Sequence, residues 1–410
     1  MIEIYEDTSL TPIKVAKMSG YLDWSSQPSM FKRYPHFLFR YKYGEKEVLR
    51  VVELSRMITS RTTIGAKPYN QLSVPSAGNL HPIELYVQIR GLKGVLSGLY
   101  HVDAGESEIV LIREIASDGV EPYVGLSKRL SGMIFIVSVV PFRSQWKYGE
   151  RSLRYCYLDM GHQVGAIGAS LKLHERHMTI LSDFDQTVLN EFMGFKGEEF
   201  VGAVLSCGEL GDKNVKTFKQ NVMHVSPTDY SELDGTVVNN IAKSEILKSD
   251  VFQLSCSLSE TDILNRRSTR FFDSDGLSKN KLESLMKLLH IHSYPISSYS
   301  VVLRDNHMKA GIYLDNKLIK EGMFAENMIG LLLDQSFIKY ADVITVITSK
   351  YFSANKLIQA GVLVHNFYME AEVAKYGFSG IGAFYDKKLQ SFLGIDDYIL
   401  YISAVGEEKK

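Results

Sequence analysis

Hydrophobic and polar positions alternate in several short segments of the chain, and this pattern predicts β-strands that place one face in a core. Helical spacing of apolar residues occurs as well, in residues 281–289 and in the glycine- and alanine-rich stretch 158–173. A sheet covered by helices, the α+β class, is the fold that such a mixture favours. The predicted strands are IELYVQIR (83–90), MIFIVSVV (133–140), VGAVLSC (201–207), DVITVIT (342–348) and YILYISAV (398–405).

The same order of segments occurs twice, which indicates an internal duplication. Gly98-Leu99-Tyr100-His101 follows the strand 83–90, and Gly311-Ile312-Tyr313-Leu314 follows the segment 299–304. The later matches keep this order: the helix with His162 and the helix with His365, Phe184-Asp185 and Tyr385-Asp386, Phe192-Met193-Gly194 and Phe392-Leu393-Gly394, Cys207-Gly208-Glu209 and Val405-Gly406-Glu407. We therefore expect two related units, at 49–212 and 257–410.

Two further segments fall outside these units. Residues 213–256 are polar with few periodic apolar positions, which predicts a connector. Residues 1–48 precede the first unit, and their spaced aromatic residues and prolines suggest an extended arm that packs on the body, through Trp24, Pro28, Phe31, Tyr34 and Pro35.

Composition narrows the class of protein. The 410 residues are 45% hydrophobic and 23% charged with a net charge of −1, which fits a folded protein without a basic field for nucleic acid or anionic lipid. The longest apolar run, 133–140, is too short for a bilayer span, and the first residues lack the features of a secretion signal. Three widely separated cysteines, Cys156, Cys207 and Cys256, argue against a disulfide framework. We expect a cytoplasmic protein.

The first motif with chemical potential is PSAGNLHP at 75–82, directly before a strand. Small residues between prolines form a rigid loop whose backbone can approach a flat ligand. Ser76 and Asn79 add groups that can hydrogen bond to the pyrimidine edge of a flavin. A plain polar turn into the strand is the alternative.

Two more motifs lie in the second unit. RRSTRFF at 266–272 places arginines at alternating positions around a hydroxyl, which suits a phosphate dianion. GFSGIGAFYD at 377–386 follows a helix and predicts a glycine-rich turn with backbone N–H groups facing a ligand. A solvated basic turn and a helix cap are the respective alternatives.

Together the three motifs resemble the FMN-binding pattern of the nitroreductase superfamily. Their amino-acid sequences are most similar to those of its SagB-type azoline dehydrogenases. The resemblance implies two fused nitroreductase-like units, each a central, mainly antiparallel sheet flanked by helices, forming an intramolecular pseudodimer. It also implies FMN at the interface between units. The FMN-binding residues that it implies are Pro75, Ser76, Gly78, Asn79, Arg266, Ser268, Arg270, Gly380, Ile381 and Gly382.

The two units have lost complementary parts of this pattern. The first keeps PSAGN, but its RxSxR counterpart is Ser60-Arg61-Thr62-Thr63 and its glycine segment has become residues 174–179. The second keeps RRSTR and SGIGAFYD, while its loop has become residues 292–299. We therefore expect one composite FMN site per chain and a vestigial second site.

Lys147-Tyr148 resembles the catalytic Lys-Tyr pair of SagB-type dehydrogenases. Azoline oxidation requires removal of a carbon-bound proton, and an adjacent ammonium would lower the pKa of a tyrosine from about 10 and make it an available base. A surface turn with an aromatic anchor is the alternative. The histidines show no metal-ligand spacing: His174 and His177 lack a carboxylate or cysteine partner, so we expect no metal site. No GxGxxG follows a first strand, so no nicotinamide site is visible.

The expected function is oxidation of azolines to azoles on a ribosomally made peptide or a related natural-product intermediate. Molecular oxygen is the expected electron acceptor and a YcaO-like cyclodehydratase the expected partner, with further self-association open. A general FMN nitro or quinone reductase is one alternative. A flavin-binding scaffold subunit of a biosynthetic complex is another.

Overall fold

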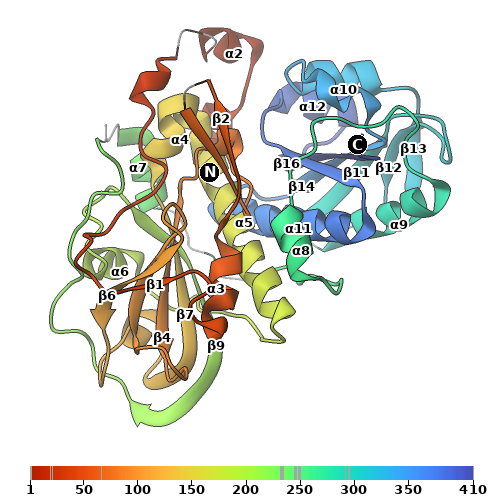
Figure 1. The fold of residues 1–410 in the computed structure, drawn as a ribbon. Helices are drawn as coiled ribbons and strands as arrows, with labels where there is room; N and C mark the ends of the chain where they lie inside the picture. The colour runs from red at the N-terminus through yellow and green to blue at the C-terminus, as the bar shows by residue number, and fades with distance from the viewer. Residues whose placement is uncertain are drawn as a thin grey trace.

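A computed structural model describes residues 2–18, 20, 22–65, 67–230, 235–243, 247, 251–290, 292–293 and 296–409. Figure 1 shows two bodies side by side, the first in orange to green and the second in teal to blue. Each is built on its own antiparallel sheet with helices against it, so the expected α+β class and the two fused units are confirmed.

The first unit contains a seven-stranded sheet with the order β1-β6-β5-β4-β7-β9-β8. All of its neighbouring strands pair antiparallel. A separate two-stranded ribbon, β2 and β3, stands apart from this sheet, and its tip lies near the N-terminal segment. The strands are β1 (Arg40–Lys42), β2 (Ile58–Ile64), β3 (Lys67–Leu72), β4 (Ile83–Arg90), β5 (Gly98–Asp103), β6 (Glu108–Glu114), β7 (Lys128–Val139), β8 (Thr179–Ile180) and β9 (Phe200–Asn214).

The second unit repeats this order as β13-β12-β11-β14-β16-β15, with β10 added beside β11. Strand for strand, β11 takes the place of β4, β14 that of β7 and β16 that of β9. The short strands β8 and β15 are also equivalent, because each pairs with the outer side of the last long strand. The strands are β10 (His292–Ser293), β11 (Ile296–Val302), β12 (Gly311–Leu314), β13 (Lys317–Glu321), β14 (Val343–Ser349), β15 (Gly377–Ile381) and β16 (Tyr398–Gly406).

Two long helices, α5 (Ser152–Leu173) and α11 (Ala354–Ala374), pack against each other between the sheets. Gly161 and Gly361 face each other at the crossing, where an added Cβ on either would overlap the backbone of the other helix. This reciprocal contact agrees with the match of the helix that carries His162 to the helix that carries His365, and it makes Gly165 the residue equivalent to His365. The remaining helices are α1 (Ile2–Thr8), α2 (Pro12–Met18), α3 (Arg50–Ser55), α4 (Pro141–Tyr148), α6 (Gln186–Phe192), α7 (Gly235–Ala242), α8 (Glu260–Asn265), α9 (Lys279–Leu289), α10 (Ala325–Leu331) and α12 (Asp386–Leu393).

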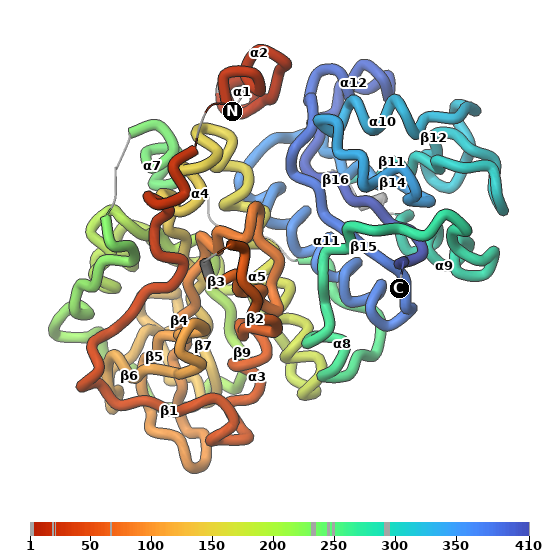
Figure 2. The backbone as a smooth tube through the Cα atoms, turned by 45° about the horizontal axis from the view of Figure 1, so that its top comes forward, coloured from red at the N-terminus to blue at the C-terminus, as the bar shows by residue number. Residues whose placement is uncertain are grey.

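The N-terminal segment differs from the expected extended arm. It begins with the two helices α1 and α2, then runs along the first unit to β1, as the red trace in Figure 2 shows. Tyr5 is buried because α1 lies in the joint between the units, and β1 completes one edge of the first sheet. Part of the expected connector, residues 231–234, 244–246 and 248–250, lies outside the described residues.

The glycine-rich segment also differs from expectation. Gly377–Ile381 is not a turn but the edge strand β15, paired with β16. Phe378 and Ile381 are buried in two different core clusters, so the strand is packed on both faces despite its glycines. Only the residues that follow, 382–385, form a loop before α12.

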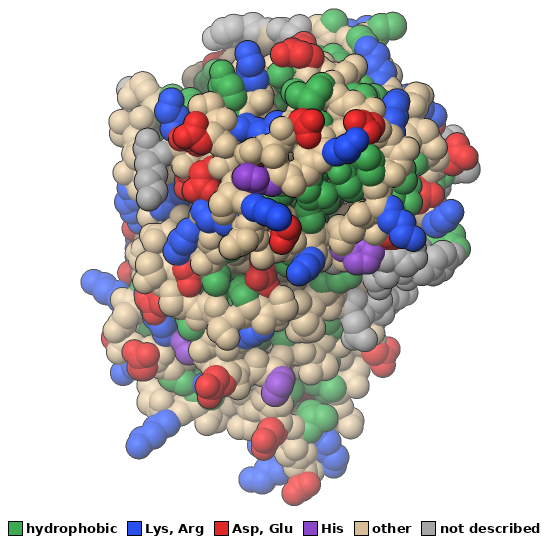
Figure 3. Space-filling view, turned by 90° about the vertical axis from the view of Figure 1, so that its right-hand side faces the viewer, with side chains coloured by type: hydrophobic (Ala, Val, Ile, Leu, Met, Phe, Trp, Pro, Cys, Tyr) green, Lys and Arg blue, Asp and Glu red, His purple; other side chains and the backbone are tan. Residues whose placement is uncertain are grey.

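The surface shown in Figure 3 carries Lys and Arg side chains intermixed with Asp and Glu, and neither sign dominates this face. Among the described residues, no helix has the length and apolar character that a bilayer crossing requires.

Candidate functional site

A cavity of about 260 Å³ opens where the two units meet. Most of the residues expected to bind the cofactor line it, from elements far apart in the sequence. The lining residues are Pro75, Ser76, Ala77, Gly78, Tyr148, Tyr155, Leu158, Asp159, His162, Ser268, Arg270, Gln335, Tyr368, Gly380, Ile381, Gly382, Ala383 and Tyr401. The structure therefore brings nine of the twelve expected site residues to one cavity, and leaves Asn79, Lys147 and Arg266 off its wall.

The first unit contributes the loop at 75–79, which has an unusual backbone. Gly78 and Asn79 both take left-handed conformations, with φ of 62° and 59°. At Gly78 an added Cβ would overlap the Tyr148 hydroxyl, so only glycine fits there. Asn79 turns away from the cavity and donates its amide to Asn70 O at 2.9 Å. Its role is therefore to hold the loop against β3.

Asp159 of α5 holds this loop through two hydrogen bonds. Its carboxylate accepts the Ser76 hydroxyl at 2.6 Å and the Ala77 N–H at 3.3 Å. The side chain is buried, and burial raises its pKa to about 7, partly offset by these two hydrogen bonds.

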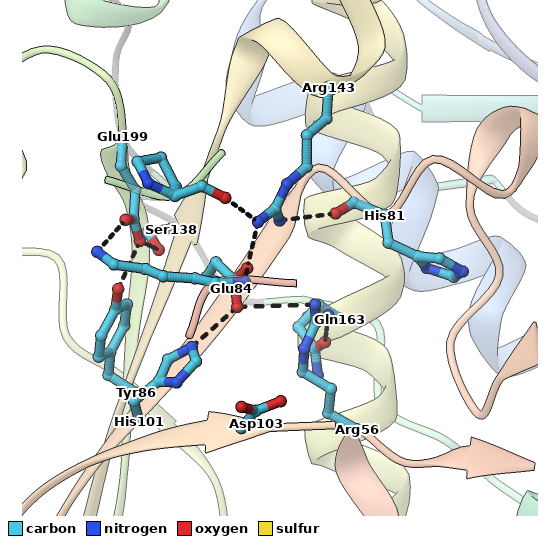
Figure 4. Close-up of polar contacts among 12 residues, drawn as sticks. Arg56, His81, Glu84, Tyr86, His101, Asp103, Ser138, Arg143, Gln163 and Glu199 are labelled. Carbon is cyan, nitrogen blue, oxygen red and sulfur yellow. Dashed lines mark hydrogen bonds and ion pairs between the residues drawn. The ribbon is translucent and has the colours of Figure 1, made fainter. Parts of the chain in front are cut away.

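A buried group of charged side chains supports the strand that follows the loop (Figure 4). Glu84 of β4 accepts from Arg143 at 2.7 Å and from His101 at 3.0 Å. The Arg143 guanidinium also donates to His81 O, at the end of the loop. The Arg143 guanidinium and the hydrogen bond to His101 hold the pKa of Glu84 well below its ordinary value in spite of burial. This cluster ties the loop to the sheet of the first unit.

The three arginines of the second unit have separate roles. Arg270 lines the cavity, donates to Ser379 Oγ at 2.5 Å and makes no ion pair among the described residues. Arg266 instead points into the protein, where it donates to the carbonyls of Leu72 and Ser73. Arg267 binds Thr59. Arg266 and Arg267 therefore fasten the second unit to the ribbon and loop of the first, and Arg270 is left facing the cavity.

The edge strand β15 forms the opposite wall. The Gly380 N–H donates to the Tyr368 hydroxyl at 2.7 Å, and this hydroxyl also contacts Ser268 at 2.8 Å. The Gly382 carbonyl accepts from Arg151 at 2.7 Å. A Cβ on Gly382 would come within 2.6 Å of the Tyr155 ring, so the strand lies close against the tyrosines of the cavity.

The Gly382 carbonyl is held by a buried ionic joint between the units. Asp386, the first residue of α12, pairs with Arg151 at 2.9 Å and with Arg154 at 2.6 Å. The N-terminal helix closes this joint: Leu10 N–H donates to Asp386 at 2.9 Å, and Arg154 donates to Tyr5 O. The chain start, the first unit and the second unit thus meet next to the cavity.

The Lys147-Tyr148 pair lies at the end of α4, with the Tyr148 hydroxyl beside Gly78. The Lys147 ammonium stands over the Tyr148 ring, 5.2 Å from its centroid, and over the Trp24 ring at 4.9 Å. Burial raises the pKa of Tyr148 well above its ordinary value, and burial lowers that of Lys147. The direction of the Tyr148 shift is opposite to the one expected from a neighbouring ammonium, and the catalytic role of the pair stays a prediction.

Several cavity residues were not found by sequence reasoning. Tyr155, Leu158, Asp159 and His162 lie at positions i, i+3, i+4 and i+7 of α5, and so share one helical face. A polar stripe on a helix that is otherwise apolar was the available signal. Tyr368, Tyr401 and Gln335 carried no local signal.

The equivalent place on the other side of α5 and α11 is built differently. At this second place Gly168 of α5 occupies the position equivalent to Tyr368 of α11. Val362 of α11 likewise occupies the position equivalent to His162 of α5. The connector crosses this place: Leu254 O accepts from Lys172 at 2.5 Å, and Phe252 O accepts from Asn366 at 2.8 Å. No counterpart of the 75–79 loop lines it among the described residues.

No group of three or more His, Cys, Asp or Glu side chains arranged to hold a metal occurs in the described part of the chain. The ionisable side chains of the cavity are instead single groups set among tyrosines and backbone.

Comparison with known proteins agrees with this architecture. Residues 263–407, most of the second unit, match the Nitroreductase family. Over 94 residues the chain is 31% identical to a Methanocaldococcus jannaschii protein named "Putative nitroreductase MJ1384"; this match covers 22% of the chain and 47% of that protein, about half its length. Over 99% of both chains, the fold matches a crystal structure titled as a putative nitroreductase from Anabaena variabilis, with a TM-score of 0.80 and 22% identity. The whole two-unit fold is thus shared with a solved structure.

Proposed function

We propose that this protein is an FMN-dependent oxidoreductase that binds one FMN per chain in the cavity between its units. The observation that carries the proposal is the composite wall: Ser76 and Gly78 from the first unit face Ser268, Arg270 and the β15 edge from the second. The family match of the second unit supports it, since residues 263–407 include both of that unit's contributions.

The residues present fit such a cofactor. Arg270 offers a guanidinium without an anionic partner among the described residues, as a phosphate requires. The loop at 75–78 offers a flat backbone surface with no side chain at Gly78. Tyr155, Tyr368 and Tyr401 supply aromatic surface and hydroxyl groups. Bound FMN would supply the ability to accept a hydride from a substrate and to pass the electrons on.

We propose further that the substrate is an azoline in a ribosomally made peptide, oxidised to an azole with molecular oxygen as the acceptor. The position of Lys147 and Tyr148 next to Gly78 supports this choice. With its pKa raised by burial, Tyr148 acts as a neutral hydrogen-bond donor that orients the substrate. Lys147 lies beside the cavity wall, where its charge contacts the Tyr148 ring.

A general FMN reductase acting on a nitro compound or quinone is the second candidate. The name of the matched Methanocaldococcus protein favours it. The two candidates differ in their need for Tyr148, because an open flavin face suffices for a small diffusible acceptor.

Flavin content tests the cofactor. We expect the purified protein to be yellow and to release one FMN per chain in acid, because one combination of half-sites keeps every binding element. A ratio near two would contradict the composite site. Release of FAD would contradict the choice of cofactor.

The Tyr148→Phe variant tests the chemistry. We expect it to keep FMN but to bleach roughly tenfold more slowly in a single turnover with a thiazoline-containing peptide, through loss of one orienting hydrogen bond. Tyr351→Phe, in the exposed Lys350-Tyr351 pair of the second unit, is the matched control and should leave the rate unchanged. If the flavin of Tyr148→Phe bleaches at the wild-type rate, the general reductase becomes the favoured function.

A further inference from the structure

Asp159 is the one Asp or Glu side chain on the cavity wall in the part of the chain that the structure describes. It is 4% exposed and makes no ion pair among the described residues. Within the described residues it accepts hydrogen bonds from Ser76 and Ala77 alone, both in the loop proposed to bind FMN. A buried carboxyl without a cation at a proposed redox site is an uncommon arrangement, since burial of the charged form costs free energy.

The groups around Asp159 do not supply a positive charge. Tyr148 from α4 and Tyr401 from β16 have pKa values raised by burial, and both are neutral at ordinary pH. On its own helix, the Tyr155 and Cys156 pKa values are raised by burial and that of His162 is lowered by burial, so these are neutral as well. Arg270 lines the same cavity from the second unit, but donates to Ser379 and not to Asp159.

We propose that Asp159 takes up one proton when the bound flavin is reduced by two electrons, and releases it when the flavin is reoxidised. This rests on the proposed FMN site. In the balance, two electrons and one proton go to the flavin, which becomes an anion, and a second proton goes from solvent to the Asp159 carboxylate. Two negative charges in one low-dielectric cavity repel each other, so reduction raises the affinity of Asp159 for a proton.

The same step serves substrate oxidation. An azoline that becomes an azole loses a hydride to the flavin and a proton from the neighbouring atom. Asp159 accepts that proton, a task that Tyr148 cannot perform with a pKa raised by burial. With its own pKa near 7, Asp159 is matched to proton exchange at neutral pH.

The midpoint potential of the bound flavin, measured from pH 5.5 to 8.5, tests this inference. For a two-electron couple each proton taken up adds about 30 mV per pH unit to the slope, the equivalent of a tenfold change in the equilibrium constant. Between the pKa of Asp159 beside oxidised flavin and its higher pKa beside reduced flavin, we expect the wild-type slope to exceed that of Asp159→Asn by up to one such proton. Asn keeps the shape and an acceptor for the Ala77 N–H, but cannot take up a proton.

Asp103→Asn is the matched control. Asp103 is a buried carboxyl whose pKa is also raised by burial, but it lies on β5 away from the cavity. This variant should keep the wild-type slope. Equal slopes for wild type and Asp159→Asn would overturn the inference.

The wild-type curve tests the inference alone if Asp159→Asn does not fold. A wild-type slope of one proton per two electrons throughout the range would also overturn it. Protein that binds no flavin at all would contradict the proposed function rather than the role of Asp159.

Discussion

The two units share their strand order but differ in what lies beneath the sheet. In the first unit, Glu84 and Glu199 are buried with Arg143, His101 and Lys32 in charged contacts. Both units also have an apolar cluster here, with Ile136 and Val204 in the first and Val346 and Ile402 in the second. The charged cluster of the first unit holds the loop in place through His81 O, and the apolar cluster of the second unit packs on Ile381 of the edge strand β15. Each unit is thus built for one half of the site.

The largest expected effect comes from the buried ionic joint between the units, formed by Asp386 with Arg151 and Arg154. Replacing Asp386 with Asn leaves Arg151 and Arg154 buried without their charge partner, which we expect to cost roughly 3–5 kcal/mol of unfolding free energy. Asp396→Asn, at an exposed position of the same unit, should have no such effect. Chemical unfolding monitored by tryptophan fluorescence measures both. Equal stability of the two variants would show that the joint does not hold the units together.

The second prediction concerns pH and the first unit's side of the site. The folded protein binds the Asp159 proton more tightly than the unfolded chain, because burial raises the folded pKa to about 7. The protonated Asp159 therefore contributes its full stabilisation to the folded protein below about pH 4, and this contribution is lost as pH rises to about 7. The free energy of unfolding falls by up to roughly 4 kcal/mol over this range. Asp159→Asn should remove this loss, so its stability relative to wild type rises between pH 4 and pH 8. Urea unfolding of flavin-free protein measures it, and a constant difference would contradict the burial argument.

The third prediction compares Arg270 of the cavity wall with Arg61 of the altered motif in the first unit. Arg270→Ala should weaken FMN binding by about 1.5–3 kcal/mol, roughly ten- to a hundredfold, through loss of a charge-assisted phosphate contact. Arg61, in the blurred motif of the first unit, is exposed on β2 and donates to Gly105 O. Arg61→Ala should keep its flavin on dialysis. Equal loss from both variants would mean that both half-sites are in use.

The sequence predicted the parts of the fold that depend on local chemistry. Alternating apolar residues located five strands, and the repeated order predicted two units. The glycine segment was misjudged because β16 offers an unpaired edge, and pairing with it turns flexible residues into the strand β15. No local pattern reveals which edge of a distant strand is free.

Side-chain direction was the main failure at the site. Arg266 follows directly on α8, whose end aims it at the carbonyls of Leu72 and Ser73 instead of the cavity. Lys147 and Tyr148 both reach Gly78 from the end of α4: an added Cβ there would overlap the Tyr148 hydroxyl and lie 3.2 Å from Lys147 Nζ. The sequence did place the ammonium near this hydroxyl, but the burial that raises the Tyr148 pKa depends on residues distant in the chain. Asp159 was overlooked because its partner Ser76 is distant in the chain.

Because its two walls come from different units, the cavity can form only after both units have been synthesised. Gly78 belongs to the first unit, whereas Gly380 and Gly382 lie about 300 residues later in the chain. At ordinary rates of synthesis the loop waits on the order of tens of seconds for its opposite wall. Loss of β15 would thus abolish the site while leaving the sheet of the first unit whole. A ligand that needs both walls can be bound only after this part of the second unit has been made.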